Sequence, residues 1–389
     1  MLAAVVGGML QGVEACYLAG KAGWRVLLID MKSAAPAVGL CDEFRQVDVT
    51  EEGGLEEALN GVDLIVPALE NESALRSLWT TSQRMSVPAV FDPAAYAVSS
   101  SKVTSNRLFK ELGIATPPDW PGCGFPVVAK PVSESGSRGV RLFRDHNSLA
   151  GFFGSSHPPE GWVVQEYIEG PSYSLEVVGH EGCCFPLQVT DLAMDPDHDC
   201  KRVSAPSDLS SYLVASFEEM SVSIGSALEL NGIMDVEVIL NGGRLHVLEI
   251  DARLPSQTPT AVFWSTGLNL LGVLGDMWTG KHTEPPSTGT APRGVILEHL
   301  QCRRGSLHVK GEHVMAGGAP LRIRQGFFGA DEALTNFEPG IDDWVATLIV
   351  CGEDRESAWA KRERVIARIM DECKLSEFID AELTTGTND

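Results

Sequence analysis

The first 67 residues alternate short apolar segments with helical ones, and this alternation restricts the fold more than any other feature of the chain. Leu2–Val6 is typical of a strand, Gly7-Gly8 of a turn and Gly12–Ala22 of a helix that ends before Gly23. The remaining expected elements are strands at Arg25–Ile29, before Asp48 and at Asp63–Pro67, and a helical stretch at Leu55–Leu59. Strands that alternate with helices form parallel sheets, so residues 1–92 are predicted to form a Rossmann-like α/β domain.

The chain is strongly acidic, with 53 Asp and Glu against 30 Lys and Arg and a net charge of −23 over 389 residues. Binding nucleic acid requires clustered cations, so we expect no nucleic-acid partner. No apolar stretch approaches the roughly 20 residues of a membrane-spanning helix, and the N-terminus lacks a basic signal-peptide region. These features predict a cytoplasmic protein without membrane contact. Nine cysteines without a CxxC pair are expected to be reduced thiols.

A Gly/Ser loop at Ser133–Gly139 follows a strand, Pro126–Lys130, that ends in a lysine. Such a loop can fold over phosphates and donate backbone N–H groups, and Lys130 would add a positive charge at the same place. Taken alone, the motif is also compatible with a solvated hairpin tip and a surface lysine.

Two extended segments, Ile233–Leu240 and Arg244–Asp251, are joined by Asn241-Gly242-Gly243, a strong hairpin signal. A three-residue turn would place Asp235 opposite Glu249, with Leu248 and Ile250 in the core. Carboxylates on one face repel each other, which a bound divalent cation would remove. The alternative is a solvated polar face that nearby arginines compensate.

The turn Gly7–Gly12 follows a strand and opens a helix, so its amides could hold an anion, and Asp30 lies where a ribose-binding acid would be. The spacing departs from GxGxxG, and a tight β–α turn that needs small residues explains it equally well. A nicotinamide-dependent oxidoreductase would use this turn, but it would leave the acidic hairpin and the Lys130 loop without a role.

Several runs together resemble the ATP-grasp superfamily of carboxylate–amine ligases. They are Pro126-Val127-Val128-Ala129-Lys130-Pro131, Val164-Gln165-Glu166-Tyr167-Ile168-Glu169-Gly170 and Glu249-Ile250-Asp251-Ala252-Arg253. The resemblance implies a mixed α/β (α+β) ATP-grasp fold behind the Rossmann-like domain. The implied division is 1–92 for that domain, 93–170 for the lid subdomain with a helical lead-in, 171–285 for the large subdomain with the hairpin, and 286–389 for a C-terminal domain.

The branch that joins 3-methylornithine to lysine in pyrrolysine biosynthesis is the most similar. The run Glu249–Thr260 and the segment Asn231–Glu237 carry this likeness. It implies that ATP activates the carboxylate of 3-methyl-D-ornithine as an acyl phosphate, which the ε-amine of L-lysine attacks. Another amino-acid or dipeptide ligase is the alternative. The implied cofactors are ATP and two Mg²⁺ ions. The implied partners are small molecules, with a homodimer as a further expectation.

The resemblance also implies residue roles. The implied ATP-binding residues are Met9, Asp30, Asp48, Lys102, Lys130, Ser137, Gln165, Glu166, Tyr167 and Ile168. Lysine would contact Leu10, Gln11 and Glu70. The ornithine pocket would be lined by Ser174, Leu175, Glu176, Arg253, Ser256 and His299. Mg²⁺ would bind Asp235, Glu249 and Asp251, and Arg253 and Lys130 would be catalytic. Met9 stands where the family usually has Lys, and Asp251 where it has Asn.

Overall fold

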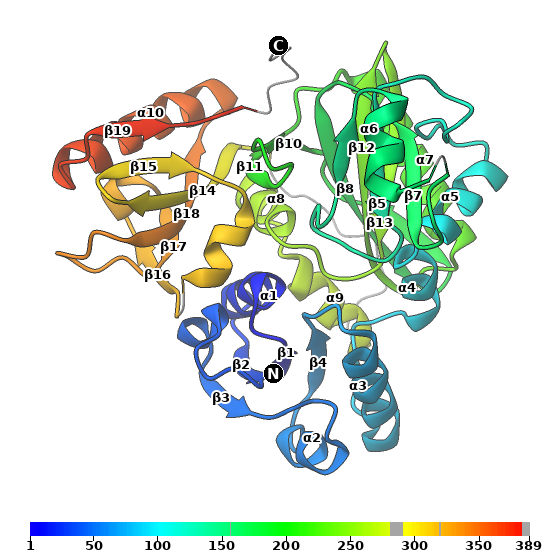
Figure 1. Ribbon diagram of the computed structural model, residues 1–389. Coiled ribbons are helices and arrows are strands. Elements are labelled where there is room, and N and C mark those ends of the chain that lie inside the picture. The colour runs from blue at the N-terminus through cyan, green and yellow to red at the C-terminus, as the bar shows by residue number, and fades with distance from the viewer. Residues whose placement is uncertain (156, 281–290, 319, 383–389) are drawn as a thin grey trace.

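The computed structural model describes residues 1–155, 157–280, 291–318 and 320–382, and Figure 1 shows three sheets in this part of the chain. The N-terminal sheet is parallel, in the order β3-β2-β1-β4. Its strands and helices are β1 (Leu2–Val6), α1 (Leu10–Lys21), β2 (Arg25–Asp30), the 3₁₀ helix η1 (Pro36–Leu40), β3 (Glu43–Gln46), α2 (Glu52–Ala58), β4 (Leu64–Pro67) and α3 (Glu72–Met85). The parallel sheet predicted from the first 67 residues is therefore confirmed.

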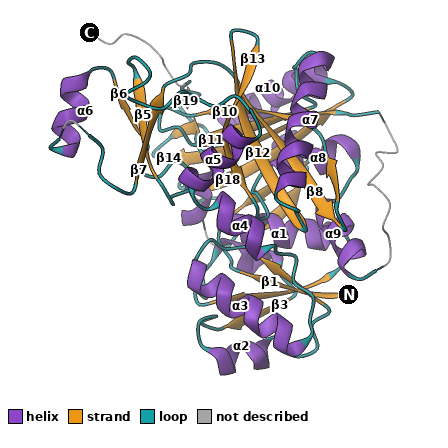
Figure 2. Ribbon diagram, turned by 90° about the vertical axis from the view of Figure 1, so that its right-hand side faces the viewer, coloured by secondary structure: helices purple, strands orange, loops and turns teal. Residues whose placement is uncertain are grey.

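A small antiparallel sheet, in the order β6-β5-β7, forms the lid. Its elements, with the helices that lead into it, are α4 (Pro93–Ser99), α5 (Lys102–Glu111), β5 (Val127–Pro131), β6 (Arg141–Phe143), α6 (His146–Phe153) and β7 (Trp162–Glu166). The helical lead-in consists of two helices, since α4 ends at Ser99 and α5 begins at Lys102. Figure 2 shows the lid sheet and α6 projecting to one side of the large sheet.

The third sheet has 12 strands in the central order β13-β12-β8-β10-β11-β14-β18-β17-β16. The strands are β8 (Ser172–His180), β9 (Cys183–Pro186), β10 (Thr190–Met194), β11 (Cys200–Ala205), β12 (Gly232–Asn241), β13 (Arg244–Asp251), β14 (Gly294–Arg303), β15 (Ser306–Val309), β16 (Arg322–Gln325), β17 (Glu332–Thr335), β18 (Trp344–Gly352) and β19 (Glu377–Ile379). This sheet continues across the expected start of a C-terminal domain at 286. That boundary lies within 281–290, outside the described residues, and the division into four parts stays a prediction.

Helices cover the large sheet and connect it to the N-terminal one. They are α7 (Ser211–Ala227), α8 (Thr258–Thr266), α9 (Leu270–Trp278), α10 (Arg355–Glu372), and the 3₁₀ helices η2 (Glu312–Gly317) and η3 (Phe327–Gly329). Helix α7 packs on β8 and β9, and α10 packs on β14 and β18. Helix α1 contacts α8, α9 and η2, so one continuous apolar core joins residues of both sheets. Of the described helices, none is long and apolar enough to span a membrane. All nine cysteines are free, as expected.

The expected three-residue turn of the β12–β13 hairpin is wrong. Only Gly242 and Gly243 form the turn, with φ angles of +57° and +79° that favour glycine. Asn241 therefore pairs with Arg244, which is one residue away from the register that a three-residue turn would give.

A bulge in the same hairpin changes which acids face each other. Leu248 is the extra residue, so Glu237 pairs with Glu249 and Asp235 pairs with Asp251. The expected Asp235–Glu249 pairing is thus wrong. Leu248 lines a cavity rather than entering the core.

Candidate active site

The first cavity lies between the lid sheet and the large sheet and has a volume of about 470 Å³. It brings together seven of the residues for which ATP binding was predicted. These are Lys102, Lys130, Ser137, Gln165, Glu166, Tyr167 and Ile168. Strand β5 supplies Lys130, and β7 and the residues after it supply the four at 165–168, so two neighbouring lid strands form one wall.

Two lysines place positive charge in the first cavity. Burial lowers the pKa of Lys130, and the nearby carboxylate of Glu249 opposes that shift. Lys102 Nζ lies 2.5 Å from the carbonyl oxygen of Glu134 and 3.4 Å from Glu249 Oε2. A half-buried ammonium held beside an open cavity is suited to phosphate oxygens.

The Ser133–Gly139 loop closes one end of the first cavity by contacting three other segments. The hydroxyl of Ser137 donates to the carbonyl of His198 over 2.6 Å, and the Ser135 hydroxyl donates to the Glu70 carboxylate. Gly136 packs so closely that a Cβ there would lie 3.3 Å from the ring of His313. The loop is therefore fixed by the N-terminal part, by the β10–β11 turn and by η2.

A patch of carboxylates lies on β8, β12 and β13. Burial and the neighbouring Asp235 raise the pKa of Glu176 to about 8. Burial raises the pKa of Asp251 to about 7 and that of Asp235 to about 6. Burial and the facing Glu249 hold the pKa of Glu237 well above its usual value. The patch has more negative charge than its surroundings compensate.

The donor chemistry of this patch fits a hard divalent cation such as Mg²⁺, which prefers oxygen ligands. Within the described ranges, no group of three or more His, Cys, Asp or Glu side chains is arranged as a ready metal site. Asp235 instead accepts a 2.5 Å hydrogen bond from Ser174, and Asp251 forms a 2.6 Å ion pair with Arg253. Neither oxygen of Glu176 has a hydrogen-bond partner among the described residues.

A second cavity of about 540 Å³ is lined by loops of the N-terminal sheet and, from the rest of the molecule, by the Gly/Ser loop, Arg253, Ser256 and the start of η2. The remaining predicted ATP-binding residues, Met9, Asp30 and Asp48, line this cavity and not the first one. The predicted lysine-binding residues Leu10, Gln11 and Glu70 line the second cavity as well.

Asp30 and Glu70 both have partners within the protein. Asp30 accepts hydrogen bonds from the backbone amides of Gly8 and Lys32 over 2.6 and 2.7 Å, which fixes the first loop. Glu70 forms a 2.6 Å ion pair with Arg253 and accepts a 3.0 Å hydrogen bond from Gln11.

A third, smaller cavity of about 120 Å³ contacts the acidic patch and the residues after β13. Asp235, Glu237, Glu249 and Asp251 line it together with Arg253, Ser256 and Glu312. Arg253 lines both the second and the third cavity and is paired with acids of each, Glu70 and Asp251. This arginine is thus placed where both cavities can be reached.

The structure separates the residues for which ornithine binding was predicted. Ser256 and Arg253 line the third cavity, while Ser174 and Glu176 lie on β8 next to Asp235. Leu175 points to the opposite face and packs in the core with Phe217, because successive strand residues alternate faces.

His299 does not line any of these three cavities. Its Nδ1 lies 2.8 Å from the Thr347 hydroxyl, and burial lowers the pKa of the ring to about 4. The side chain is held inside the β14–β18 pairing, so a direct substrate contact is not supported by this geometry.

Two residues of η2, Glu312 and His313, belong to the site although neither was predicted from the sequence. Glu312 accepts a 2.6 Å hydrogen bond from the Ser256 hydroxyl, and His313 Nδ1 lies 2.7 Å from Asp199 Oδ2. Their segment has no phosphate loop, strand alternation or acid pair, and it reaches the site only through the packing of the large sheet. No local pattern in the sequence signals it.

The comparisons with known proteins agree with this geometry. Residues 99–257 match the ATP-grasp domain family. The chain is 38% identical over 368 residues to the 3-methyl-D-ornithine–L-lysine ligase of Methanosarcina acetivorans, covering 92% of this chain and 94% of that protein. It is 37% identical over 370 residues to the ligase of the same name from Methanosarcina mazei, covering 92% and 93%.

Solved structures show the same fold at low sequence identity. The biotin carboxylase domain of a Hydrogenobacter thermophilus 2-oxoglutarate carboxylase matches with a TM-score of 0.71 and 16% identity, over 94% of this chain and 89% of that one. N5-carboxyaminoimidazole ribonucleotide synthetase from Thermotoga maritima matches with a TM-score of 0.66 and 18% identity, over 94% and 98%. Together with the identity over nearly the whole length of the Methanosarcina enzymes, these findings show that the chain belongs to the 3-methyl-D-ornithine–L-lysine ligase family and has the ATP-grasp fold.

Proposed function

We propose that this protein uses ATP to join the carboxylate of 3-methyl-D-ornithine, through an acyl phosphate, to the ε-amine of L-lysine, giving 3-methylornithyl-N6-lysine. The observation that carries the proposal is the position of Arg253, which lines both the second and the third cavity and pairs with an acid from each. A reaction that joins two amino acids needs two pockets that meet at one cationic group, which can stabilise the developing negative charge.

ATP occupies the first cavity in this proposal. Lys102 and Lys130 contact its phosphates, and the Ser133–Gly139 loop covers them with Ser137. Two Mg²⁺ ions are held by Asp235, Glu249 and Asp251, and when bound they offset the negative charge of the phosphates. The raised pKa values of Asp235 and Asp251 support this role, because a bound cation would stabilise the charged carboxylates that burial disfavours.

The ornithine substrate occupies the third cavity, with its carboxylate near Arg253 and Ser256. Glu176 is a buried carboxylate without a hydrogen-bond partner in the described part of the chain, but it lines none of the three cavities, so its contact with a substrate ammonium group stays a prediction. Ser174 orients Asp235 beside it. Leu175 can contribute only through its backbone.

Lysine occupies the second cavity, with Glu70 as the acid that receives a cationic group and with Leu10 and Gln11 beside it. ATP contact by Met9, Asp30 and Asp48 stays a prediction, since these residues line the lysine cavity rather than the first one. A homodimer also stays a prediction.

The test mixes the protein with Mg·ATP, L-lysine and either D-ornithine or 3-methyl-D-ornithine, and follows ADP release and the dipeptide mass. We expect dipeptide formation that depends on all three substrates. ADP release no higher than in a control without lysine would refute the proposal. Replacing lysine by other amines in the same assay tests the alternative dipeptide ligases, and titration with NADH tests the oxidoreductase.

A further inference from the structure

Five residues line both the second and the third cavity, so they surround the place where the two proposed amino-acid substrates meet. They are Ser135, Gly136, Arg253, Ser256 and Glu312. Only two of these side chains are ionisable, Arg253 and Glu312, and they have opposite charges. Arg253 suits the phosphate or the oxyanion of the reaction. The role of a carboxylate at the same place is not explained by binding ATP or Mg²⁺.

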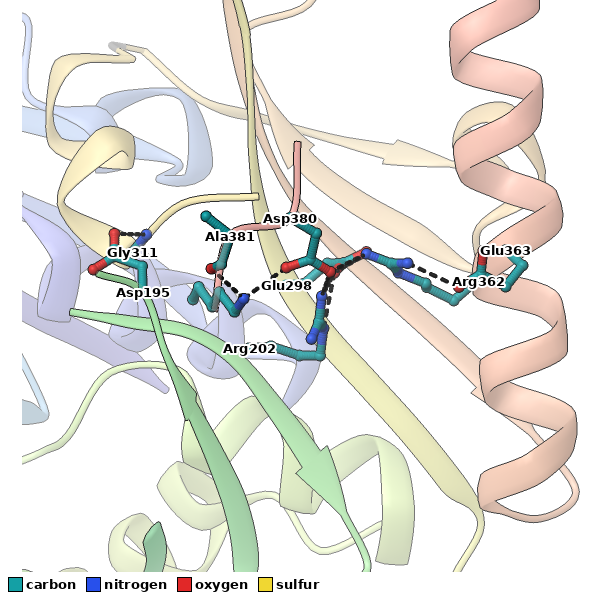
Figure 3. Close-up of polar contacts among 9 residues, drawn as sticks. Asp195, Arg202, Glu298, Gly311, Arg362, Glu363, Asp380 and Ala381 are labelled. Atoms are coloured by element: carbon teal, nitrogen blue, oxygen red, sulfur yellow. Dashed lines mark hydrogen bonds and ion pairs between the residues drawn. The ribbon is translucent and has the colours of Figure 1, made fainter. Parts of the chain in front are cut away.

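The backbone on both sides of Glu312 is held by carboxylates of the β10–β11 turn. The amide of Gly311 donates a 3.0 Å hydrogen bond to Asp195 Oδ2, which Figure 3 shows, and the amide of His313 donates a 3.0 Å bond to Asp199 Oδ2. A Cβ at position 311 would lie 2.0 Å from Asp199 Oδ2, so glycine is required there. Glu312 is therefore fixed in position before any substrate binds.

The carboxylate of Glu312 is also oriented from the substrate side. The Ser256 hydroxyl donates a 2.6 Å hydrogen bond to Glu312 Oε2, and Ser256 belongs to the segment that follows the acidic hairpin. A carboxylate has about four lone-pair sites, so the hydrogen bonds from Ser256 and Gln257 leave others that can accept a proton.

The proposed reaction needs a proton acceptor at this boundary. A lysine ε-ammonium has a pKa of about 10.4 in water, so it is protonated at neutral pH and has no lone pair for attack. One proton must leave before the nitrogen can add to the acyl carbon. A carboxylate within reach of the amine can accept it.

We propose that Glu312 is a catalytic residue that takes a proton from the lysine ε-ammonium and so frees the nitrogen to attack the acyl phosphate, an inference that rests on the proposed function. The nitrogen forms a bond to the acyl carbon, and the bond from that carbon to the phosphate oxygen breaks with its electron pair. The first amine proton goes to Glu312 and from there to water. The second leaves with the phosphate as hydrogen phosphate, so the charges and atoms balance.

The surroundings of Glu312 favour this role. Burial raises the pKa of its carboxyl group, and the hydrogen bonds from Ser256 and Gln257 oppose the shift. The charged or titratable groups that face it are Glu14 on α1, Asp199 in the β10–β11 turn, Cys200 on β11, Arg253 after β13 and the adjacent His313. A carboxylate of raised pKa is a stronger proton acceptor than one in water.

The experiment compares two nucleophiles in the full-length Glu312→Gln protein. Lysine needs to lose a proton, whereas hydroxylamine is largely uncharged at neutral pH and traps the acyl phosphate without a base. We expect kcat/KM for lysine to fall by roughly 10²-fold or more, while hydroxamate formation stays within about threefold of wild type. The Glu312→Asp variant should recover part of the lysine reaction. Glu372→Gln, which removes an exposed acid on α10, is the matched control.

The pH profile gives a second readout. In the wild type, kcat/KM for lysine should fall as Glu312 becomes protonated at low pH, and Glu312→Gln should lose this acidic limb. Equal loss of dipeptide and hydroxamate in Glu312→Gln would overturn the proposal, as would an unchanged lysine reaction. If wild type makes hydroxamate but no dipeptide, the proposed function fails instead, because the second substrate is then wrong.

Discussion

Two clusters of charged residues lie on the same large sheet and differ in one respect. The C-terminal cluster consists of Lys201, Arg202, Glu298, Arg362 and Asp380 and contains both signs of charge. Figure 3 shows Arg202, Glu298, Arg362 and Asp380 pointing toward one another. The acidic patch, Glu176, Asp235, Glu237, Glu249 and Asp251, consists of acids only, and two of the five pair with a cation outside it, Glu249 with Lys102 and Asp251 with Arg253. Both clusters are at least partly buried, so the contrast concerns compensation of charge rather than exposure to water.

Within the C-terminal cluster, each charge has a partner at hydrogen-bonding distance. Glu298 accepts from Arg202 Nε over 2.9 Å and from Arg362 Nε over 2.8 Å. Asp380, from the segment after β19, pairs with Lys201 at 2.6 Å and with Arg362 at 3.1 Å. The cluster thereby fastens the C-terminal segment and α10 to strands β11 and β14.

The difference separates a structural network from a proposed binding site. In a network where every buried charge has a partner, a ligand would add no favourable charge interaction. Buried acids close to one another repel, and a bound cation would remove this unfavourable energy. Loss of a charge should therefore have opposite consequences in the two clusters: lower stability in the C-terminal cluster, and loss of activity without loss of stability in the acidic patch.

The largest expected effect is on turnover. Glu249→Gln removes one proposed Mg²⁺ ligand and should therefore weaken stabilisation of the transition state by several kcal/mol. This loss corresponds to a fall of about 10³-fold in the rate of dipeptide formation. ADP and dipeptide are measured at saturating substrates. The control is Glu338→Gln, which removes a surface ion pair of the C-terminal part. Full activity of Glu249→Gln would remove the metal assignment.

The second prediction concerns the C-terminal cluster. Glu298→Gln leaves the guanidinium groups of Arg202 and Arg362 without their buried carboxylate, which should lower the free energy of unfolding by about 3–5 kcal/mol. Urea unfolding measures the change. Glu338→Gln, whose partner Arg324 is exposed, should change stability by less than about 1 kcal/mol. A small effect at Glu298 would mean that the network does not fasten α10.

The third prediction is pH-dependent. Burial alone would raise the pKa of Asp380, but the Lys201 hydrogen bond and the Arg202 charge outweigh it and hold the pKa below its usual value. The carboxylate thus contributes stability above its unfolded pKa of about 3.9 and loses it as the pH falls through the folded value. Asp380→Asn should lower the free energy of unfolding by about 1–2 kcal/mol at pH 7. Unfolding near pH 3 should show a smaller difference, and a constant difference would contradict the assignment.

Much of the fold follows from local sequence, and the site only partly does. The Rossmann-like strands, the lid strand before the Gly/Ser loop and the hairpin segments lie where apolar periodicity and turn residues place them. The hairpin register does not, because a two-residue Gly242-Gly243 turn and a bulge at Leu248 together decide which acids meet. Apart from the two glycines, no local pattern in the sequence predicts the short turn or the bulge. Glu312 joins the site through packing between distant strands, which local patterns do not contain.

The register also decides the smallest predicted effect, at Glu237. This half-buried acid faces Glu249, and burial with that neighbour keeps its pKa well above its usual value. In the ligand-free protein at neutral pH, folding must then either bind a proton or bring two negative charges together, and both oppose stability. Glu237→Gln should therefore raise the free energy of unfolding by about 1 kcal/mol, opposite in sign to Glu298→Gln. The gain should shrink when Mg·ATP is added, because bound cations compensate the wild-type charge. Destabilisation by Glu237→Gln would show that the acidic patch is as well compensated as the C-terminal cluster, and the contrast between the two would be lost.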